Sequence, residues 1–313
     1  MEGDGEAGGA PEAGGRHRVT LHPRVTERLL AAGLDPDDTE RVVRGALHED
    51  FRYGPDLTSA ATAAPGARAV ASVVARQPGV LAGLPVAFSV LDAAGVPPDA
   101  AEPLRTDGDR IGAGCAVLRI RAPLREMLGA ERTMLNFVTH LSGIATATRA
   151  WADALAGTGA AVRDTRKTTP GLRQLEKYAV RCGGGVNHRM GLGDAALVKD
   201  NHVAAAGGVA AAIRAVRAAA PGLPLEVECD SLAQVREALD AEAGLILLDN
   251  MGLADLRAAV ALARRYPQVR LEASGGLRLA AAREVAETGV DFLAVGALTH
   301  SSPALDLGLD LLD

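Results

Sequence analysis

The sequence predicts an α/β protein built from an N-terminal α+β, sandwich-like domain and an incomplete α/β barrel, open, with about six or seven strands. Strand-like and helix-like segments alternate from about residue 161 onward, the pattern of repeated βα units. Nearly every predicted strand in that region ends in a polar residue. With 313 residues, 48% of them hydrophobic, the chain can bury more than one core.

Composition narrows the function classes. The first 17 residues are rich in Gly and Glu, lack the build of a signal peptide, and are expected to be a disordered tail. A net charge of -6 and 3% aromatic residues argue against a nucleic-acid partner. No apolar run reaches the roughly 18 residues of a membrane span. Three widely spaced cysteines form no metal motif and suggest the cytoplasm: Cys115, Cys182 and Cys229.

The N-terminal domain is expected over residues 18–127. Short helices are predicted over 25–34 and 36–50, the second capped by Asp38 or Thr39. A turn-rich acidic segment, EDFRYGPDLTS, follows them. Val-rich alternation predicts strands within 67–83 and 115–122, with a helix over 85–95 between them.

A long helix is predicted from about Ala122 to Leu155. Met134, Val138, Leu141 and Ala145 recur at helical spacing and give it one apolar face. The barrel domain is expected over residues 128–297. The last segment, 298–313, is expected to pack back on the first domain or to cap the barrel.

Six barrel strands are predicted, within 160–167, 195–201, 225–230, 244–250, 269–276 and 291–297, with helices between them over 203–220, 231–240, 253–266 and 278–289. Their polar ends are Arg166-Lys167, Lys199-Asp200, Glu228, Asp249-Asn250, Ser274-Gly275-Gly276 and Gly296. Active sites of α/β barrels lie at the carboxyl ends of the strands, whereas a doubly wound sheet gathers ligand groups at one crevice. Six polar ends therefore favour a ring with the site at its mouth.

Cations gather in one segment of this acidic protein: Arg163, Arg166, Lys167, Arg173, Lys177, Arg181, Arg189 and Lys199. Forked guanidinium groups and compact ammonium groups together suit a small ligand with several negative charges. Surface ion pairs are the alternative, and for Lys177 and Arg181 both interpretations stay open. The run Gly183-Gly184-Gly185 directly precedes Asn187-His188-Arg189 and indicates backbone that turns tightly or approaches a ligand closely.

Acids and glycines complete the predicted mouth. Glu228 and Asp249 offer hard oxygen ligands for Mg²⁺ or partners for ribose hydroxyls, unless they are only solvated strand ends or caps. Ser274, Gly275 and Gly296 end the last two strands, where barrels commonly bind phosphate, although plain glycine turns are the alternative.

Together these motifs resemble the quinolinate phosphoribosyltransferase family. The matching stretches are EDFRYGPDLTS, GVLAG, ERTMLNFVTHLSGIAT, DTRKTTPGLRQLEKYAVRCGGGVNHR, ALVKDNH, LEVECDS, LLDNM, EASGG and VGALTHS. The resemblance implies an N-terminal α/β domain joined to an incomplete barrel. It also implies phosphoribosyl transfer from phosphoribosyl pyrophosphate to quinolinate with decarboxylation, giving nicotinate mononucleotide, pyrophosphate and CO₂ for NAD biosynthesis. Mg²⁺ and a cytoplasmic homodimer with a shared active site are further expectations.

The resemblance also implies roles for single residues. Arg132 is expected to reach the neighbouring subunit's substrate pocket, while Arg166, His188, Arg189 and Lys199 hold the two quinolinate carboxylates. Lys167 contacts the phosphoribosyl donor, the acidic pair Glu228 and Asp249 lies near ribose and Mg²⁺, and Ser274, Gly275 and Gly296 bind the 5′-phosphate. The catalytic set implied is Lys167, Lys199, Glu228 and Asp249.

Three alternatives remain open. A related phosphoribosyltransferase would use a different base, although the full Arg/His/Arg/Lys set favours a dicarboxylate. Lys167 or Lys199 at a strand end would suit a Schiff-base enzyme. A non-catalytic protein would bind the donor without releasing pyrophosphate.

Overall fold

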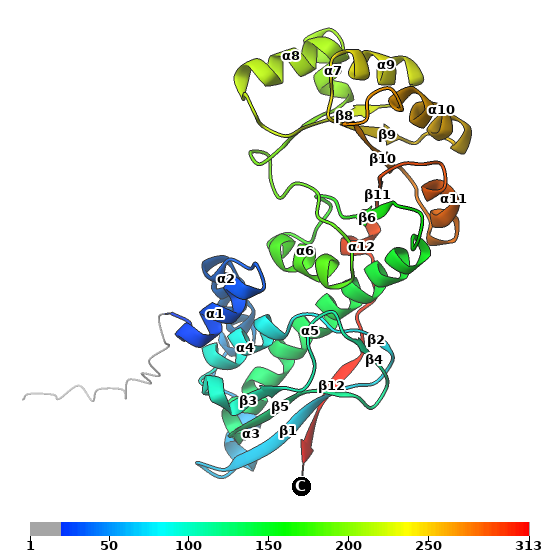
Figure 1. Ribbon diagram of the computed structural model, residues 1–313. Helices are drawn as coiled ribbons and strands as arrows, with labels where there is room; N and C mark the ends of the chain where they lie inside the picture. Colours follow the sequence, from blue (N-terminus) through cyan, green and yellow to red (C-terminus); the bar gives the residue numbers. More distant parts are fainter. Residues whose placement is uncertain (1–19, 313) are drawn as a thin grey trace, which may run out of the picture.

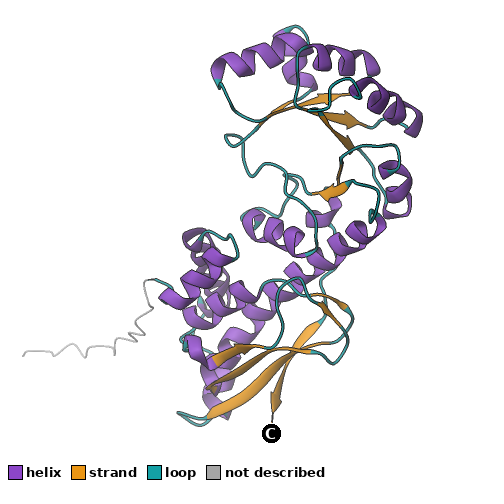
Figure 2. Cartoon of the chain, in the orientation of Figure 1, coloured by secondary structure: helices purple, strands orange, loops and turns teal. Residues whose placement is uncertain are grey.

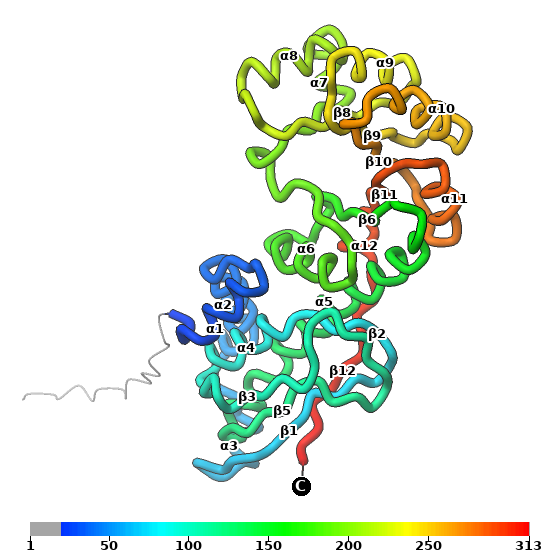
Figure 3. Tube along the Cα trace, viewed as in Figure 1, coloured from blue at the N-terminus to red at the C-terminus, as the bar shows by residue number. Residues whose placement is uncertain are grey.

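The computed structural model describes residues 20–312, so the predicted tail lies outside the described residues. Figure 1 shows two parts, one holding the N-terminal helices and an antiparallel sheet and the other holding the parallel strands with their helices. One long helix, α5 (Leu124–Ala154), runs from the first part to the second, which the Cα trace of Figure 3 also shows. Within residues 20–312, no helix has both the length and the apolar character needed to cross a bilayer.

The N-terminal part begins with α1 (Pro23–Ala31), α2 (Pro36–Phe51) and α3 (Leu57–Thr62). The cap of α2 is Asp35, which accepts from the backbone N–H groups of Asp37 and Asp38, so the prediction of Asp38 or Thr39 was wrong. Pro36 occupies the first helical position, and the capping residue precedes it. The segment predicted as turns also contains α3, which Asp56 caps by accepting from the N–H of Ser59 at 2.9 Å.

A four-stranded antiparallel sheet forms the rest of this part, in the order β12-β1-β5-β3. Its strands are β1 (Arg68–Ala75), β3 (Ala101–Pro103), β5 (Ala116–Pro123) and β12 (Leu307–Leu312). The small ribbon β2 (Gly79–Val80) with β4 (Arg110–Ile111), the helix α4 (Leu84–Ala93) and the turn η1 (Pro98–Ala100) complete it. Because β12 pairs with the whole of β1 from position 70 to 75, the end of the chain joins the N-terminal sheet.

Helix α5 provides the core that both parts share. Met134, Val138, Leu141 and Ala145 are buried, which confirms the predicted apolar face. The helix packs against α4 on one side and against α6 (Arg173–Cys182) of the barrel on the other. It runs without interruption through position 127, so both parts are built on one rigid element.

The second part is a six-stranded parallel sheet in the order β6-β11-β10-β9-β8-β7, and its two edge strands do not pair with each other. Its strands are β6 (Ala161–Arg163), β7 (Ala196–Val198), β8 (Leu225–Cys229), β9 (Leu245–Asp249), β10 (Arg270–Ser274) and β11 (Phe292–Ala294). All six predicted strands are present, and Figure 2 shows them curving into an open arc. The predicted open barrel is therefore confirmed.

Helices cover the outer face of this arc, as Figure 1 shows. They are α7 (Asp200–Ala206), α8 (Val209–Ala219), α9 (Leu232–Asp240), α10 (Leu253–Ala263), η2 (Leu279–Ala281), α11 (Ala282–Ala286) and α12 (Ala297–His300). The single helix predicted over 203–220 was wrong, because Gly207 and Gly208 interrupt it and separate α7 from α8.

The open edge of the barrel carries the beginning of a further strand. After α6, Val186 forms a parallel bridge with Arg163, donating its N–H to the carbonyl of Val162 at 2.9 Å. A Cβ at Gly185 would lie 2.7 Å from Thr148 Cγ2 on α5. The glycine run therefore serves the close packing of this stub, and residues 187–195 cross the gap to β7.

We predict that Gly185→Ala lowers the free energy of unfolding by about 1–3 kcal/mol, because the added methyl group overpacks the contact with α5. Gly193→Ala is the matched control, since nothing lies within 4 Å of a Cβ at that position. Thermal or urea unfolding of the two variants measures the difference. Equal stability of the two variants would contradict this account of the glycine run.

Candidate active site at the open barrel

The carboxyl ends of the barrel strands bring polar side chains to one edge of the sheet. Ser274 of β10 pairs with Asp249 of β9, and Ala294 of β11 pairs with Arg163 of β6. Paired residues of parallel strands point to the same face. Asp249 and Ser274 thus lie side by side at the mouth of the barrel.

A tight double turn fixes the ends of β9 and β10. Asn250 has a left-handed backbone with φ of 54°, and its N–H donates to the carbonyl of Ser274 at 2.9 Å. Its side-chain amide donates to the Asp249 carboxylate at 2.7 Å. Gly275 has φ of 96°, and a Cβ there would lie 2.2 Å from Asn250 Oδ1, so only glycine fits. The sequence analysis assigned no role to Asn250.

Lys167 lies beside the end of β11. A Cβ at Gly296 would stand 2.9 Å from Lys167 Cδ, and the Thr299 hydroxyl donates to the Lys167 carbonyl at 2.8 Å. The Lys167 side chain is exposed. The segments after β6 and β11 therefore place the exposed Lys167 side chain against the turn that contains Gly296, one strand away from Ser274.

Arg166 and Arg189 form a pair of guanidinium groups with open donors. The Nε atoms of both are buried and have no hydrogen-bond partner within the described part of the chain. Burial and the neighbouring Arg166 lower the pKa of Arg189, while Asp194 and Glu226 oppose that shift. Arg189 Nη1 donates to the carbonyl of Ala195 at 2.9 Å, and the buried Nε donors of the two cations suit a group that carries negative oxygens.

Lys199 follows β7 and completes this side of the mouth. Its Nζ lies 3.1 Å from Glu228 Oε2 of β8, and half of its side chain is exposed. Two residues earlier on the same face of β8, Glu226 Oε2 lies 2.7 Å from His188 Nε2. Strand β8 therefore connects the lysine with the loop that carries His188 and Arg189.

His188 uses both of its ring nitrogens within the protein. Nε2 faces Glu226, while Nδ1 accepts the backbone N–H of Arg189 at 2.7 Å. Accepting at Nδ1 requires the tautomer that carries its proton on Nε2, so Nε2–H donates to Glu226. The buried ring is held in one orientation, and the residue after it is the arginine of the cation pair.

The backbone of this loop is held from the outer side of the sheet by a fully buried ion pair of Lys177 and Asp164. Lys177 Nζ also donates to the His188 carbonyl at 2.9 Å, and Asp164 accepts the His188 N–H at 2.8 Å and the Asn187 amide. Burial lowers the pKa of Lys177, and Asp164 opposes that shift. Lys177 thus supports the loop instead of facing a ligand.

Arg181, the second cation with an open interpretation, has a similar structural role. It donates to the Asn187 side chain at 3.1 Å and to the carbonyl of Ala32 at 2.8 Å. These bonds tie the loop to the end of α1. The sequence analysis did not single out Asp164, although a buried acid in the middle of a predicted strand is a signal that a cation must pair with it.

Two buried carboxylates of the barrel interior were also not predicted from the sequence. Glu226 and Glu272 occupy inward positions of β8 and β10, and Arg163 pairs with Glu272. Burial and the neighbouring Glu226 raise the pKa of Glu272 to about 8, while Arg163 opposes the shift. The alternation of Glu with buried apolar residues in LEVEC and RLEAS was the available signal.

The same groups are the one His/Cys/Asp/Glu cluster within residues 20–312 with metal-ligand spacing. Ligand atoms of His188, Glu226 and Glu272 lie within 4.8 Å of one another. Arg163 already supplies a positive charge to Glu272, and the His188 proton already bridges to Glu226. The cluster is therefore compensated by protein groups, and Glu228 and Asp249 lie outside it.

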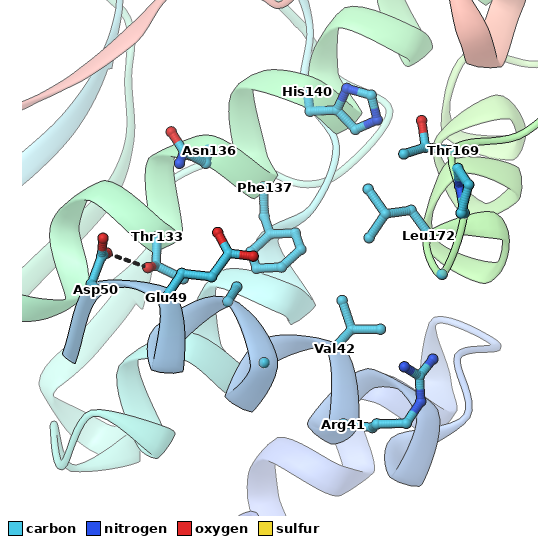
Figure 4. Close-up of a pocket in the computed structure, with 14 residues that line it drawn as sticks. Arg41, Val42, Glu49, Asp50, Thr133, Asn136, Phe137, His140, Thr169 and Leu172 are labelled. Atoms are coloured by element: carbon cyan, nitrogen blue, oxygen red, sulfur yellow. Dashed lines mark hydrogen bonds between the residues drawn. The ribbon is translucent and has the colours of Figure 1, made fainter. Parts of the chain in front are cut away.

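A groove lies away from these residues, between α2, α5 and the segment 169–172. It has a volume of about 550 Å³, and Figure 4 shows Thr133 beside Asp50, and His140 of α5 on the side of Thr169 and Leu172. Arg132 lies exposed on α5, one turn before Asn136, which lines the groove. No hydrogen bond or ion pair among the described residues joins Arg132 to the mouth of the barrel.

The raised pKa of Glu272 predicts a pH dependence of stability. This carboxyl group loses its proton near its ordinary value of 4.5 in the unfolded chain and near 8 in the folded one. Between these values the folded state binds more protons, so the free energy of unfolding should fall as pH rises through this window. In Glu272→Gln this part of the fall should disappear, which urea unfolding between pH 5 and 8 measures. Parallel profiles for both proteins would contradict the prediction.

Comparison with known proteins agrees with this architecture. The family models for the quinolinate phosphoribosyl transferase N-terminal and C-terminal domains match residues 56–142 and 144–310. A carboxylating nicotinate-nucleotide pyrophosphorylase of Mycobacterium leprae is 57% identical over 277 residues, covering 88% of this chain and 98% of the relative. The human protein of that name is 39% identical over 286 residues, covering 90% and 94%.

A solved structure shows the same fold. The nicotinate-nucleotide pyrophosphorylase from Francisella tularensis superposes with a TM-score of 0.82 at 36% identity, covering 88% of this chain and 96% of that one. The two family models together span both parts of the structure, including the shared helix α5. The chain therefore belongs to the quinolinate phosphoribosyltransferase family.

Proposed function

We propose that this enzyme transfers the phosphoribosyl group of phosphoribosyl pyrophosphate to quinolinate, with decarboxylation, to form nicotinate mononucleotide, pyrophosphate and CO₂ for NAD biosynthesis. The relatives described above carry the name of this reaction. The observation that carries the proposal is the pair Arg166 and Arg189 at the mouth of the barrel, whose buried Nε donors have no partner among residues 20–312.

Quinolinate is a pyridine with two adjacent carboxylates, and the cations suit it. The guanidinium forks of Arg166 and Arg189 can each take a carboxylate in a bidentate manner, and Lys199 adds a compact charge. The two arginines repel each other, and this repulsion adds to burial in lowering the pKa of Arg189. A dianionic ligand relieves that repulsion, whereas a neutral ring would leave it in place.

The phosphoribosyl donor fits the opposite side of the mouth. Lys167 offers an exposed ammonium group beside Gly296, and Ser274 and Gly275 offer a hydroxyl and a turn of backbone N–H groups. Backbone turns of this kind bind phosphate oxygens. The 5′-phosphate would lie between the ends of β10 and β11, with the pyrophosphate toward Lys167.

Mg²⁺ is the cofactor that we propose. Glu228 and Asp249 offer hard oxygen ligands from neighbouring strands, and each already has one partner, Lys199 or Asn250. Such a pair fits an ion held mainly by substrate phosphates, since Mg²⁺ commonly takes only one or two carboxylates. When bound, the ion would neutralise charge on the pyrophosphate.

The chemistry follows from holding two anions together. The pyridine nitrogen forms a bond to ribose C1 while the bond from C1 to pyrophosphate breaks, and Lys167 stabilises charge on the departing group. Glu228 and Asp249 stabilise the positive ribose. The quaternary nitrogen then accepts electron density as the C–C bond to the adjacent carboxylate breaks, CO₂ leaves and a proton takes its place.

Arg132 supports a homodimer with a shared site. It is exposed on α5, and Phe51 packs on Gly129, three residues before it. Tyr53 and Leu57 nearby in sequence are 84% and 74% exposed. Exposed large apolar side chains are typical of an interface, and Arg132 has no ion-pair partner among the described residues, so we propose that it reaches the partner's mouth.

We propose a cytoplasmic location, with neither nucleic acid nor membrane as a partner. The net charge of -6 disfavours nucleic acid. Cys115, Cys182 and Cys229 are free thiols. Burial raises the pKa of Cys182 and Cys229 to about 12, so both stay protonated and unreactive, as structural thiols in a reducing compartment are.

The direct test supplies quinolinate, phosphoribosyl pyrophosphate and Mg²⁺ and measures CO₂ and nicotinate mononucleotide together. Both products should appear in equal amounts, and nicotinate in place of quinolinate should be a poor substrate. Preferred use of nicotinate would contradict the dicarboxylate assignment. Borohydride trapping with a carbonyl substrate tests the Schiff-base alternative, and donor binding without pyrophosphate release would indicate a non-catalytic protein.

Arg166→Ala should lower kcat/KM for quinolinate at least tenfold, because losing one partner of a desolvated charge pair costs about 2–5 kcal/mol. Arg257→Ala, which removes an exposed arginine of α10, is the control. Steady-state kinetics measures both variants. A wild-type kcat/KM in Arg166→Ala would remove this residue from the dicarboxylate site.

The shared site predicts complementation between inactive variants. Arg132→Ala and Arg166→Ala damage different parts of each mouth, so mixed dimers should contain one mouth with both arginines intact. Mixing the two variants after subunit exchange should therefore restore part of the activity. No recovery, with exchange demonstrated by differently tagged subunits, would contradict the role of Arg132.

A further inference from the structure

A chain of contacts in the barrel interior lies directly beneath the cation pair. Arg163 pairs with Glu272 and donates to the carbonyl of Asn187 at 3.4 Å. Glu272 lies against Glu226, which receives His188 Nε2 at 2.7 Å. The chain thus begins and ends on two consecutive residues of the loop that carries Arg189.

The histidine of this chain has no nitrogen left for a ligand. Its Nδ1 accepts the N–H of Arg189, and its Nε2 faces Glu226, so a dicarboxylate would find no free donor on the ring. Only 8% of His188 is exposed. The ring therefore connects Glu226 with the backbone of Arg189.

We propose that Glu226 is a positioning residue of the dicarboxylate site: by holding His188 at Nε2, it fixes the backbone from which Arg189 reaches the ligand. The inference rests on the proposed function and deepens it, because it assigns His188 to the support of the cation pair and not to direct contact with quinolinate.

Several bonds hold the loop on either side of Arg189, including those from the Met190 and Gly191 N–H groups to Asp194, but the His188 ring is the partner of the Arg189 N–H. Asp164 and Lys177 hold the N–H and the carbonyl of His188, which fixes its backbone. These bonds do not fix the side-chain torsions, and the Arg189 N–H depends on where Nδ1 lies. Rotation of the ring would break the hydrogen bond from the Arg189 N–H to Nδ1, and the backbone of Arg189 would lose this support.

Glu226 acts through the length of its side chain and through its acceptor oxygen, not through its negative charge. Its Oε1 is buried without a hydrogen-bond partner in the described residues, and the same holds for Glu272 Oε1. A glutamine at position 226 would still accept from His188 Nε2 through its carbonyl oxygen, and its amide would donate to Glu272. An aspartate would keep the charge but would be one methylene too short.

Substitutions at position 226 can therefore change the length and the charge of the side chain separately. Glu226→Gln, Glu226→Asp and Glu226→Leu are compared with Val227→Ala, a matched control on the same strand whose buried side chain points to the opposite face. Calorimetry measures the Kd for benzene-1,2-dicarboxylate, an unreactive probe with the same two acid groups. Steady-state kinetics measures KM for each substrate and kcat, and thermal unfolding measures stability.

Glu226→Gln should bind the probe within about threefold of the wild type, whereas Glu226→Asp and Glu226→Leu should bind at least tenfold more weakly. Displacing a binding group by about 1 Å costs up to 100-fold. The KM for quinolinate should rise more than the KM for phosphoribosyl pyrophosphate. Val227→Ala should lose stability and keep its Kd, which separates positioning from a general loss of structure.

Two outcomes would overturn the inference. Equal affinity of Glu226→Asp and the wild type would show that reach is unimportant, and this variant keeps the test valid where Glu226→Leu does not fold. Weak binding by Glu226→Gln with normal binding by Glu226→Asp would mean that the charge matters, as a metal site would require. A wild type that binds no dicarboxylate would instead refute the proposed function together with the inference.

Discussion

The buried ion pair of Asp164 and Lys177 is the interaction on which the mouth of the barrel depends. An open barrel lacks the strand pairing that would hold its edge, and here the edge loop carries Arg189, one member of the cation pair. Asp164 faces outward from the end of β6 and takes hydrogen bonds from the loop and from Lys177 of α6. The bonds of this one buried carboxylate thereby hold the edge that strand pairing would otherwise hold. Burying the ion pair has a desolvation cost.

The rest of the site is arranged around charge. Cations that would repel one another are separated by acids on the strands between them: Glu272 receives Arg163, Glu226 receives His188, and Glu228 receives Lys199. Arg166 and Arg189 remain with open donors. Acids thus compensate Arg163, His188 and Lys199, while Arg166 and Arg189 keep buried donors without a partner among the described residues, an arrangement that suits the binding of anions.

Much of this could be predicted from sequence because it depends on local pattern. The six strands, the helix α5 with Met134 and Leu141 buried, and the polar strand ends follow from periodicity and turn residues. The roles of Asp164, Glu226 and Glu272 could not, since a buried acid is explained only by partners distant in sequence. Lys177 is the clearest case. A lysine on a predicted helix is compatible with an exposed or a buried position, and only the position of Asp164 in the fold shows that Lys177 is buried as its partner.

Arg132 marks a different limit. Its place on α5 follows from the helical pattern, but the role proposed for it involves a partner subunit, which the sequence pattern of one chain does not describe. The groove between α2 and α5 is lined by none of the predicted site residues, so a cavity alone does not locate the chemistry here. Arg166 and Arg189 locate it better, because their buried Nε donors without a partner among the described residues lie close together, whereas Arg149, which has the same feature, lies beside Cys182.

The most direct measurement is a crystal structure of this chain with quinolinate bound. The account predicts one carboxylate on Arg166 and the other on Arg189, with nitrogen-to-oxygen distances of about 2.7–2.9 Å, and the ring at the carboxyl ends of the barrel strands. Quinolinate bound in the groove between α2 and α5, with both arginines free of it, would contradict the account.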